Sequence, residues 1–135
     1  MPNFKWATRT AVLAAVAIVG AGVISTPASA ANNIVYFGGN GSTATCDGYM
    51  LCVYPNTSYK GSAIGSRNGA SEDDMRDYYI NDSISSIINN SGNAYCFYSD
   101  TFYKGLTFQI HAGEKWPAVN GYINDKISSW KVGNC

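Results

Sequence analysis

A chain of 135 residues has room for one domain of ordinary size, and its nine basic side chains are balanced by nine acidic ones. No basic patch or amphipathic basic segment occurs along it, so the composition excludes a protein that binds nucleic acid or docks on an anionic membrane.

Residues 1–30 have the pattern of a secretory signal peptide. Lys5 and Arg9 form a basic start, Ala11 to Ile24 is an uncharged apolar stretch, and an A-S-A cleavage site closes the segment. The apolar stretch is shorter than the ~20 residues that a membrane-spanning helix needs. We therefore expect a secreted, extracellular protein of residues 31–135 that has no membrane anchor after cleavage. With seven basic and nine acidic side chains, its net charge is −2.

Four cysteines follow in the exported part. An even number of cysteines in a secreted chain of this size favours two disulfides over a metal site. Zinc is not expected, because the sequence has no C-x-x-C pair and a single histidine, His111. The cysteines are Cys46, Cys52, Cys96 and Cys135.

The pattern of apolar residues predicts strands rather than helices. The segments around Tyr54 and Tyr98 are rich in aromatic and β-branched residues, and Leu106 to His111 alternates apolar and polar. Gly, Asn and Ser clusters separate such segments. We predict an all-β sandwich with about four strands in each half. The stretch from Gly65 to Asp77 is expected to be a polar loop, with a helical turn near Glu72 to Met75.

The sequence contains an internal repeat of two copies. Cys52 to Gly61 (CVYPNTSYKG) matches Cys96 to Gly105 (CFYSDTFYKG) 44 residues later. The octet Ile80 to Ile87 (INDSISSI) matches Ile123 to Trp130 (INDKISSW) 43 residues later. Solenoids and propellers need at least three units to bury their faces, so two units must pack against each other.

The repeat also bears on the disulfides. If the last strand of each unit lies beside its first strand, Cys135 lies near Cys96, and the first unit has no cysteine at the matching position. Cys52 then pairs with Cys46. We expect these two bridges, and a bridge between the two units is the alternative.

Each octet offers only hard oxygen donors. It carries a carboxylate (Asp82 or Asp125), a hydroxyl (Ser85 or Ser128) and the backbone carbonyls between them. Such a set suits calcium, which takes six to eight oxygens in flexible geometry, although the spacing is not that of an EF-hand. The same residues are ordinary turn formers, so a purely structural role without an ion is the alternative.

Two motifs in combination resemble the βγ-crystallin superfamily. The pattern Y-x-x-x-x-Y-x-G, at Tyr54 to Gly61 and at Tyr98 to Gly105, resembles its Greek-key signature. Both octets match its calcium motif, [ND]-[ND]-x-x-[ST]-S. The combined pattern covers nearly all of the chain from Cys52 onward. The C-x5-C start at Cys46 is most similar to small secreted actinobacterial proteins of peptidase inhibitor family I36. A killer-toxin-like protein of the same fold is a more distant similarity.

The resemblance implies a single βγ-crystallin-like sandwich made of two Greek keys, at about 46–92 and about 93–135, within a domain of 31–135. It also implies two Ca²⁺ sites. The third residue of each motif supplies a carbonyl, the fifth a hydroxyl, and the second a carboxylate that crosses to the other unit's ion. The residue after the first hairpin tyrosine supplies another carbonyl. The expected ligands are Ser83, Ser85, Pro55 and Asp125 at one site and Lys126, Ser128, Ser99 and Asp82 at the other.

The same resemblance implies an inhibitor of an extracellular metalloprotease, and we expect a monomer without enzymatic activity. Two loops are candidates for the contact with the peptidase, Asp47 to Leu51 and Glu114 to Val119. The alternatives are an antifungal protein of the killer-toxin kind and a calcium-stabilised binding module without inhibitory activity.

Three other features receive ordinary structural interpretations. His111 is interpreted as a surface histidine, because no nucleophile and orienting acid are recognisable around it. The acidic run Glu72 to Asp74 is interpreted as a solvated loop, with a protein-docking patch as the alternative. Trp116 is expected to pack mainly in the core, with an exposed anchor as the alternative.

Overall fold

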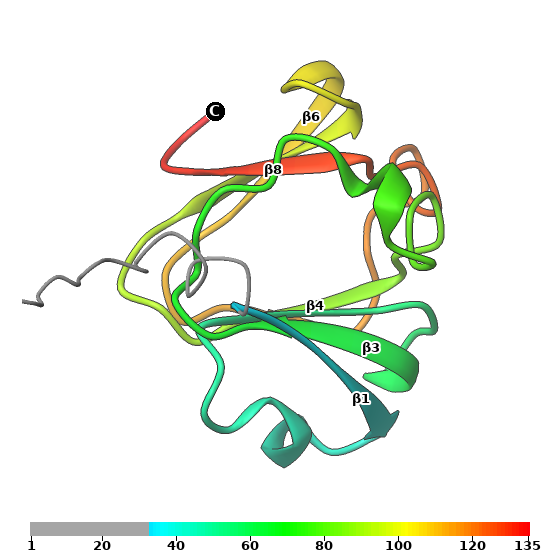
Figure 1. Ribbon diagram of the computed structural model, residues 1–135, viewed down its shortest axis with the longest axis vertical. Coiled ribbons are helices and arrows are strands. Elements are labelled where there is room, and N and C mark those ends of the chain that lie inside the picture. Colours follow the sequence, from blue (N-terminus) through cyan, green and yellow to red (C-terminus); the bar gives the residue numbers. More distant parts are fainter. Residues whose placement is uncertain (1–32) are drawn as a thin grey trace, which may run out of the picture. The chain divides into compact units, whose positions relative to one another are not determined.

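Two antiparallel sheets, facing each other, make up the part of the chain that the structure describes, residues 33–135 (Figure 1). The structure is a computed structural model, and the expected signal peptide lies outside the described residues. Within 33–135, no helix is long and apolar enough to cross a membrane. The elements in chain order are β1 (Ile34–Asn40), η3 (Thr43–Cys46), β2 (Leu51–Tyr54), β3 (Lys60–Ser66), η4 (Met75–Asp77), β4 (Ser86–Asn89), β5 (Tyr95–Asp100), β6 (Lys104–Ile110), β7 (Lys115–Trp116) and β8 (Ser129–Val132).

Each sheet is built mainly from one copy of the repeat. The first sheet has the strand order β1-β3-β2-β4-β7 and the second has the order β6-β5-β8. Each copy also contributes one segment to the sheet of the other copy. β7 of the second copy pairs with β4, and Glu72 of the first copy forms a bridge with Trp130 in β8. The predicted all-β sandwich is confirmed, and each half depends on the other for part of its sheet.

β1 was not predicted. It pairs with β3 from Ile34↔Ser66 to Asn40↔Lys60 and forms an edge of the first sheet. The second copy has no equivalent strand, so the repeat did not reveal it, and its two glycines have low strand propensity. Gly39 is required there because a Cβ at this position would lie 2.7 Å from the Tyr54 ring.

The predictions for two loops are partly wrong. Gly65 and Ser66 belong to β3 rather than to the polar loop, and the helical turn lies at Met75–Asp77 instead of Glu72 to Met75. The turn starts later because the Asp74 side chain accepts a hydrogen bond from the Arg76 N–H and so caps it. In the same way, the loop expected from Glu114 to Val119 contains β7.

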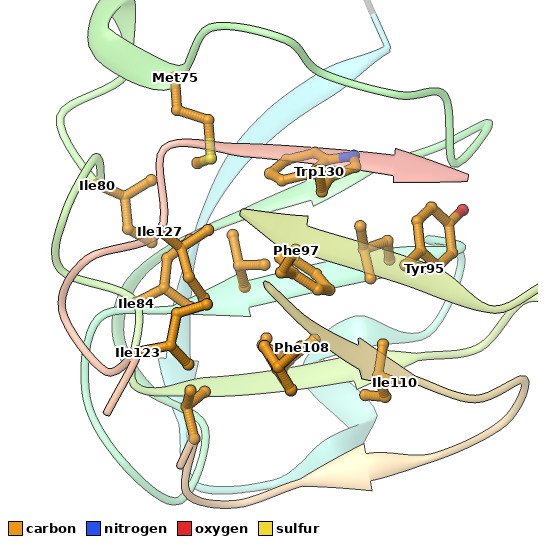
Figure 2. Close-up of a cluster of buried hydrophobic side chains, with 14 of the residues drawn as sticks. Met75, Ile80, Ile84, Tyr95, Phe97, Phe108, Ile110, Ile123, Ile127 and Trp130 are labelled. Carbon is orange, nitrogen blue, oxygen red and sulfur yellow. The ribbon is translucent and has the colours of Figure 1, made fainter. Parts of the chain in front are cut away.

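The main core lies between the two sheets, as Figure 2 shows. Phe97 and Trp130 lie near its centre, and the indole N–H donates to the Ala70 carbonyl at 2.9 Å. The first and fifth residues of both octets are completely buried in this core; they are Ile80, Ile84, Ile123 and Ile127. Because these isoleucines anchor each octet, its exposed aspartate, Asp82 or Asp125, is held at the surface in a defined position.

Two disulfides tie down the chain. The bridges are Cys46–Cys52 and Cys96–Cys135, with Cα–Cα distances of 6.0 and 5.0 Å, and they are the expected pairs. All four cysteines are used, so no disulfide joins the two halves of the described chain. Cys46 and Cys52 are fully buried in a second, smaller cluster on the first sheet.

Candidate functional site

The two octets form matching loops at one end of the sandwich, on the right of Figure 1, and each loop holds the backbone of the other. The N–H of Asp82 donates to the Ile127 carbonyl at 3.1 Å, and the N–H of Asp125 donates to the Ile84 carbonyl at 3.2 Å. Both aspartates have a positive φ, of 58° and 60°. Asp tolerates this conformation better than most residues, which explains why the motif needs a short polar side chain at this position.

The side chains cross between the loops in the same reciprocal way. Ser85 Oγ donates to Asp125 Oδ1 at 3.0 Å, and Ser128 Oγ donates to Asp82 Oδ1 at 2.8 Å. The serines are 7% and 6% exposed, whereas both aspartates are exposed. The structure therefore brings together each hydroxyl and carboxylate that were expected to share a site.

The octets also hold the tyrosine hairpins. The N–H of Ser85 donates to the Tyr54 carbonyl at 2.8 Å, and the N–H of Ser128 donates to the Tyr98 carbonyl at 2.9 Å. These bonds place the next residues along the chain, Pro55 and Ser99, beside the two octets.

The last serine of each octet has a structural role that the sequence analysis missed. Ser86 Oγ donates to the Asn56 carbonyl at 2.6 Å and accepts from the Tyr59 N–H at 3.0 Å. Ser129 Oγ makes the same two contacts in the second copy, with the Asp100 carbonyl at 2.6 Å and the Tyr103 N–H at 3.2 Å. Both serines are completely buried. The sequence signal that could have indicated this role is the serine at the same position in both octets.

A hollow of about 300 Å³ opens at the octet loops. It is lined by Asp82, Ser99, Asp100, Leu106, Asp125 and Lys126. Within residues 33–135 the only ion pair is Arg76–Asp74, so the three carboxylates of the hollow have no cationic partner. The Lys126 ammonium group instead donates to the Tyr122 carbonyl at 3.1 Å. The hollow therefore carries uncompensated negative charge.

Four of the expected ligands lie outside the lining of this hollow. Pro55, Ser83, Ser85 and Ser128 do not line the hollow. The Ser83 hydroxyl is used within its own turn, where it donates to the Ile80 carbonyl at 2.8 Å. Asp100, which does line the hollow, was missed by the sequence analysis.

The chemistry of this donor set fits a hard cation. No three His, Cys, Asp or Glu side chains in the described chain are clustered to hold a metal ion, so a cation here would be bound by one or two carboxylates with hydroxyls, carbonyls and water. Oxygen ligands of this kind suit calcium and suit soft transition metals poorly. Next to Asp82, the buried Asn81 Oδ1 has no hydrogen-bond partner, which leaves another oxygen lone pair unused in this octet.

The other residues that the sequence analysis considered have structural roles. His111 is exposed, and its backbone N–H donates to Glu114 Oε2 at 2.6 Å. This hydrogen bond lowers the pKa of Glu114. The acidic run is not a simple solvated loop: the Glu72 carboxylate accepts from the Tyr78 hydroxyl at 3.0 Å. Trp116 is partly buried against the core, with its ring 5.4 Å from Phe108.

The two loops considered for peptidase contact both have much of their backbone occupied. In the disulfide-closed loop, the Met50 N–H donates to the Ser66 carbonyl at 2.9 Å and the Met50 carbonyl accepts from the Asn90 N–H at 2.8 Å. In the other loop, the Pro117 carbonyl accepts from the Ser58 N–H at 2.7 Å. These backbone groups cannot pair with a peptidase in the manner of a bound substrate.

Comparisons with known proteins agree on fold and family. The sequence model of peptidase inhibitor family I36 matches residues 39–110, just over half of the chain. A search of the curated proteins found no match. Among solved structures, one described for the evolution of the eye-lens βγ-crystallin domain fold is 16% identical, with a TM-score of 0.61, and the match covers 76% of this chain and 98% of that one.

Two further solved structures give the same picture. A βγ-crystallin from Ciona intestinalis is 23% identical over 61% of this chain and 96% of its own, with a TM-score of 0.53. A βγ-crystallin domain from Flavobacterium johnsoniae is 25% identical over 62% and 92%, also with a TM-score of 0.53. The chain therefore belongs to peptidase inhibitor family I36, and it has the fold of a βγ-crystallin domain.

Proposed function

We propose that the protein is a secreted inhibitor of extracellular metallopeptidases whose two repeat halves are clamped together by a pair of calcium ions. Family membership supports the inhibitory activity and points to a non-enzymatic protein. Two disulfides in a member of this family are in keeping with an extracellular location. The observation that carries the calcium proposal is the crossed contact of Ser85 with Asp125 and of Ser128 with Asp82.

Calcium would be held between the two halves. One ion would take Asp125, the Ser85 hydroxyl and the carbonyls of Pro55 and Ser83; the other would take Asp82, Ser128, Ser99 and Lys126 in the matching roles. Each set supplies about four protein oxygens, so water completes the shell, and we expect dissociation constants of ~10⁻⁴ to 10⁻³ M, as in extracellular calcium modules. Because both halves contribute to both ions, binding stabilises the folded state.

Thermal unfolding tests the calcium clamp. In about 10 mM calcium the melting temperature should lie about 5 °C or more above its value in chelator, because an ion that binds only the folded state stabilises it. Asp125→Asn should remove a large part of this shift. Asp47→Asn, which changes an exposed carboxylate outside the octets, should keep the whole shift. An identical melting temperature with calcium and with chelator would rule the clamp out.

The loop from Asp47 to Leu51 is the better candidate for peptidase contact. The Cys46–Cys52 bridge closes it, and the Asn90 side-chain amide donates to the carbonyls of Cys46 and Tyr49 at 3.1 and 3.2 Å. This rigid loop presents a Met50 side chain that is 45% exposed. A rigid apolar projection loses little conformational entropy on docking. Because the Met50 backbone is already paired, the contact would be made by its side chain and not by substrate-like strand pairing.

Inhibition is tested by titrating the protein against a thermolysin-like metallopeptidase. We expect the peptidase rate to fall at micromolar inhibitor, and Met50→Asp to raise the inhibition constant at least about tenfold, because a buried hot-spot side chain contributes more than 1.4 kcal/mol. Phe102→Asp is the control: Phe102 is similarly exposed, at 52%, and lies in the hairpin of the other half. Mass spectrometry should find the chain uncut after residue 50. An unchanged peptidase rate at micromolar excess would contradict the inhibitory proposal.

A further inference from the structure

We propose that Asp100 is an additional direct ligand of the second-half calcium site and makes the two sites unequal, with the site of Asp82 and Ser128 the tighter. This inference rests on the calcium binding proposed above. It names a ligand that the repeated motifs do not contain.

The two hairpins differ at the relevant position. Asp100 lies two residues after Tyr98, and the matching residue of the first half, two after Tyr54, is Asn56. The surrounding backbone is the same in both halves, because Ser86 and Ser129 each donate to the carbonyl of this residue at 2.6 Å. The difference between the halves is therefore one of side-chain charge on a shared backbone.

The contacts of Asp100 place its carboxylate at the hollow. Asp100 lines the hollow together with Asp82, Ser99 and Lys126, which are three of the four ligands expected for the second site. Its carboxylate packs over Gly105, where a Cβ would lie 2.7 Å from Oδ2. Its one side-chain hydrogen bond in the described structure is a long one, 3.3 Å from Ser99 Oγ, and it forms no ion pair there. The carboxylate is thus free of strong partners and lies beside the Ser99 hydroxyl.

Lys126 opposes this effect but does not cancel it. It stands where the first half has Ser83, so it adds a positive charge near the second site. Its ammonium group, however, is bonded to the Tyr122 carbonyl and makes no contact with the carboxylates of the hollow. A carboxylate ligand lies 2.3–2.6 Å from a bound calcium ion and attracts it strongly. The repulsion between calcium and a solvated ammonium group that is not in contact with it is reduced by the dielectric of water and by salt. Calcium affinity rises with the number of charged ligands, so the second site should bind more tightly.

Calorimetric titration of the protein with calcium chloride tests the inference. The wild type should show two steps whose dissociation constants differ about tenfold, since ligand charge count tunes calcium affinity by such factors. Asp100→Asn should weaken the tighter step about tenfold and make the two sites nearly equal. Asn56→Asp is the matched variant and should tighten the weaker step by a similar factor. Circular dichroism in chelator should show that both variants remain folded, because both residues are exposed.

The outcomes separate this inference from the proposed function. Two equal sites in the wild type would overturn the inference alone, as would an Asp100→Asn variant whose tighter step is unchanged. Absence of any calcium binding in the wild type would overturn the calcium clamp, and this inference with it. A selective loss of the tighter step in Asp100→Asn, with the weaker step unchanged, would support both.

Discussion

At the scale of single residues, tyrosine hydroxyls make several of the polar contacts that hold the packed regions together. The Tyr95 hydroxyl donates to the Gly69 carbonyl at 2.7 Å, and the Tyr78 hydroxyl donates to Glu72 Oε2 at 3.0 Å. Burial raises the pKa of Tyr95. Burial, and then the negative charge of Glu72, raise the pKa of Tyr78 from its usual 10.0 to about 12. Both tyrosines are thus held in their neutral form by the fold.

These shifts predict loss of stability in alkali. A folded-state pKa above the unfolded value means that the contribution of Tyr78 is fully present below pH 10 and is lost as the pH rises from about 10 to about 12. The free energy of unfolding should fall across this window, as measured by urea denaturation at each pH. Tyr78→Phe should make the fall shallower, since its ring is retained and its ionisation is removed. A wild-type stability that is constant from pH 10 to 12 would contradict the prediction.

At the scale of elements, each tyrosine hairpin has a strained turn that is stabilised by hydrogen bonds to a serine distant in sequence. Residues Ser58 and Tyr59 in the first hairpin, and Phe102 and Tyr103 in the second, have positive φ. Such backbone conformations are costly for non-glycine residues and persist only where surrounding contacts hold them. The buried hydroxyls of the last octet serines supply these contacts.

Removal of these hydroxyls should therefore be costly. Ser86→Ala and Ser129→Ala should each lower the free energy of unfolding by about 1–3 kcal/mol, because each leaves a hairpin N–H and a carbonyl without their partner. Ser85→Ala, measured in chelator, is the control and should cost about 1 kcal/mol or less, since its hydroxyl makes a single bond to an exposed carboxylate. Urea denaturation measures all three. Equal losses in Ser85→Ala and Ser86→Ala would argue against the fastening role.

At the scale of the whole molecule, the two halves are joined by exchange rather than by simple stacking. β7 of the second half completes the sheet of the first, while the Glu72 bridge and the bond from the Phe102 N–H to the Asp73 carbonyl tie the first half to the second. The octet bonds add two more reciprocal links. A calcium ion at either octet would reinforce a connection that the protein chain already makes, so calcium should change stability more than structure.

Much of this architecture could be predicted from the sequence. The alternation in Leu106 to His111 predicted β6, and the repeat predicted two equivalent halves. β1 and β7 could not be predicted in this way. β1 belongs to no repeat and contains Gly38 and Gly39, and β7 is only two residues long and exists because β4 lies beside it. Local pattern carries little information about a strand that is specified by its neighbour.

The sequence by itself determined the fold class, the family resemblance and the residues of the octets, because the spacing of buried isoleucines and hairpin tyrosines is repeated in the chain. The resemblance also implied which hydroxyl shares a site with which carboxylate, but only the tertiary structure showed that these crossed pairs are in contact and that Asp100 lines the same hollow. The crossed pairs are separated by 40 and 46 residues, and they meet because the core anchors both octets at one end of the sandwich. Contacts of that range depend on how the sheets pack, which the local sequence does not encode.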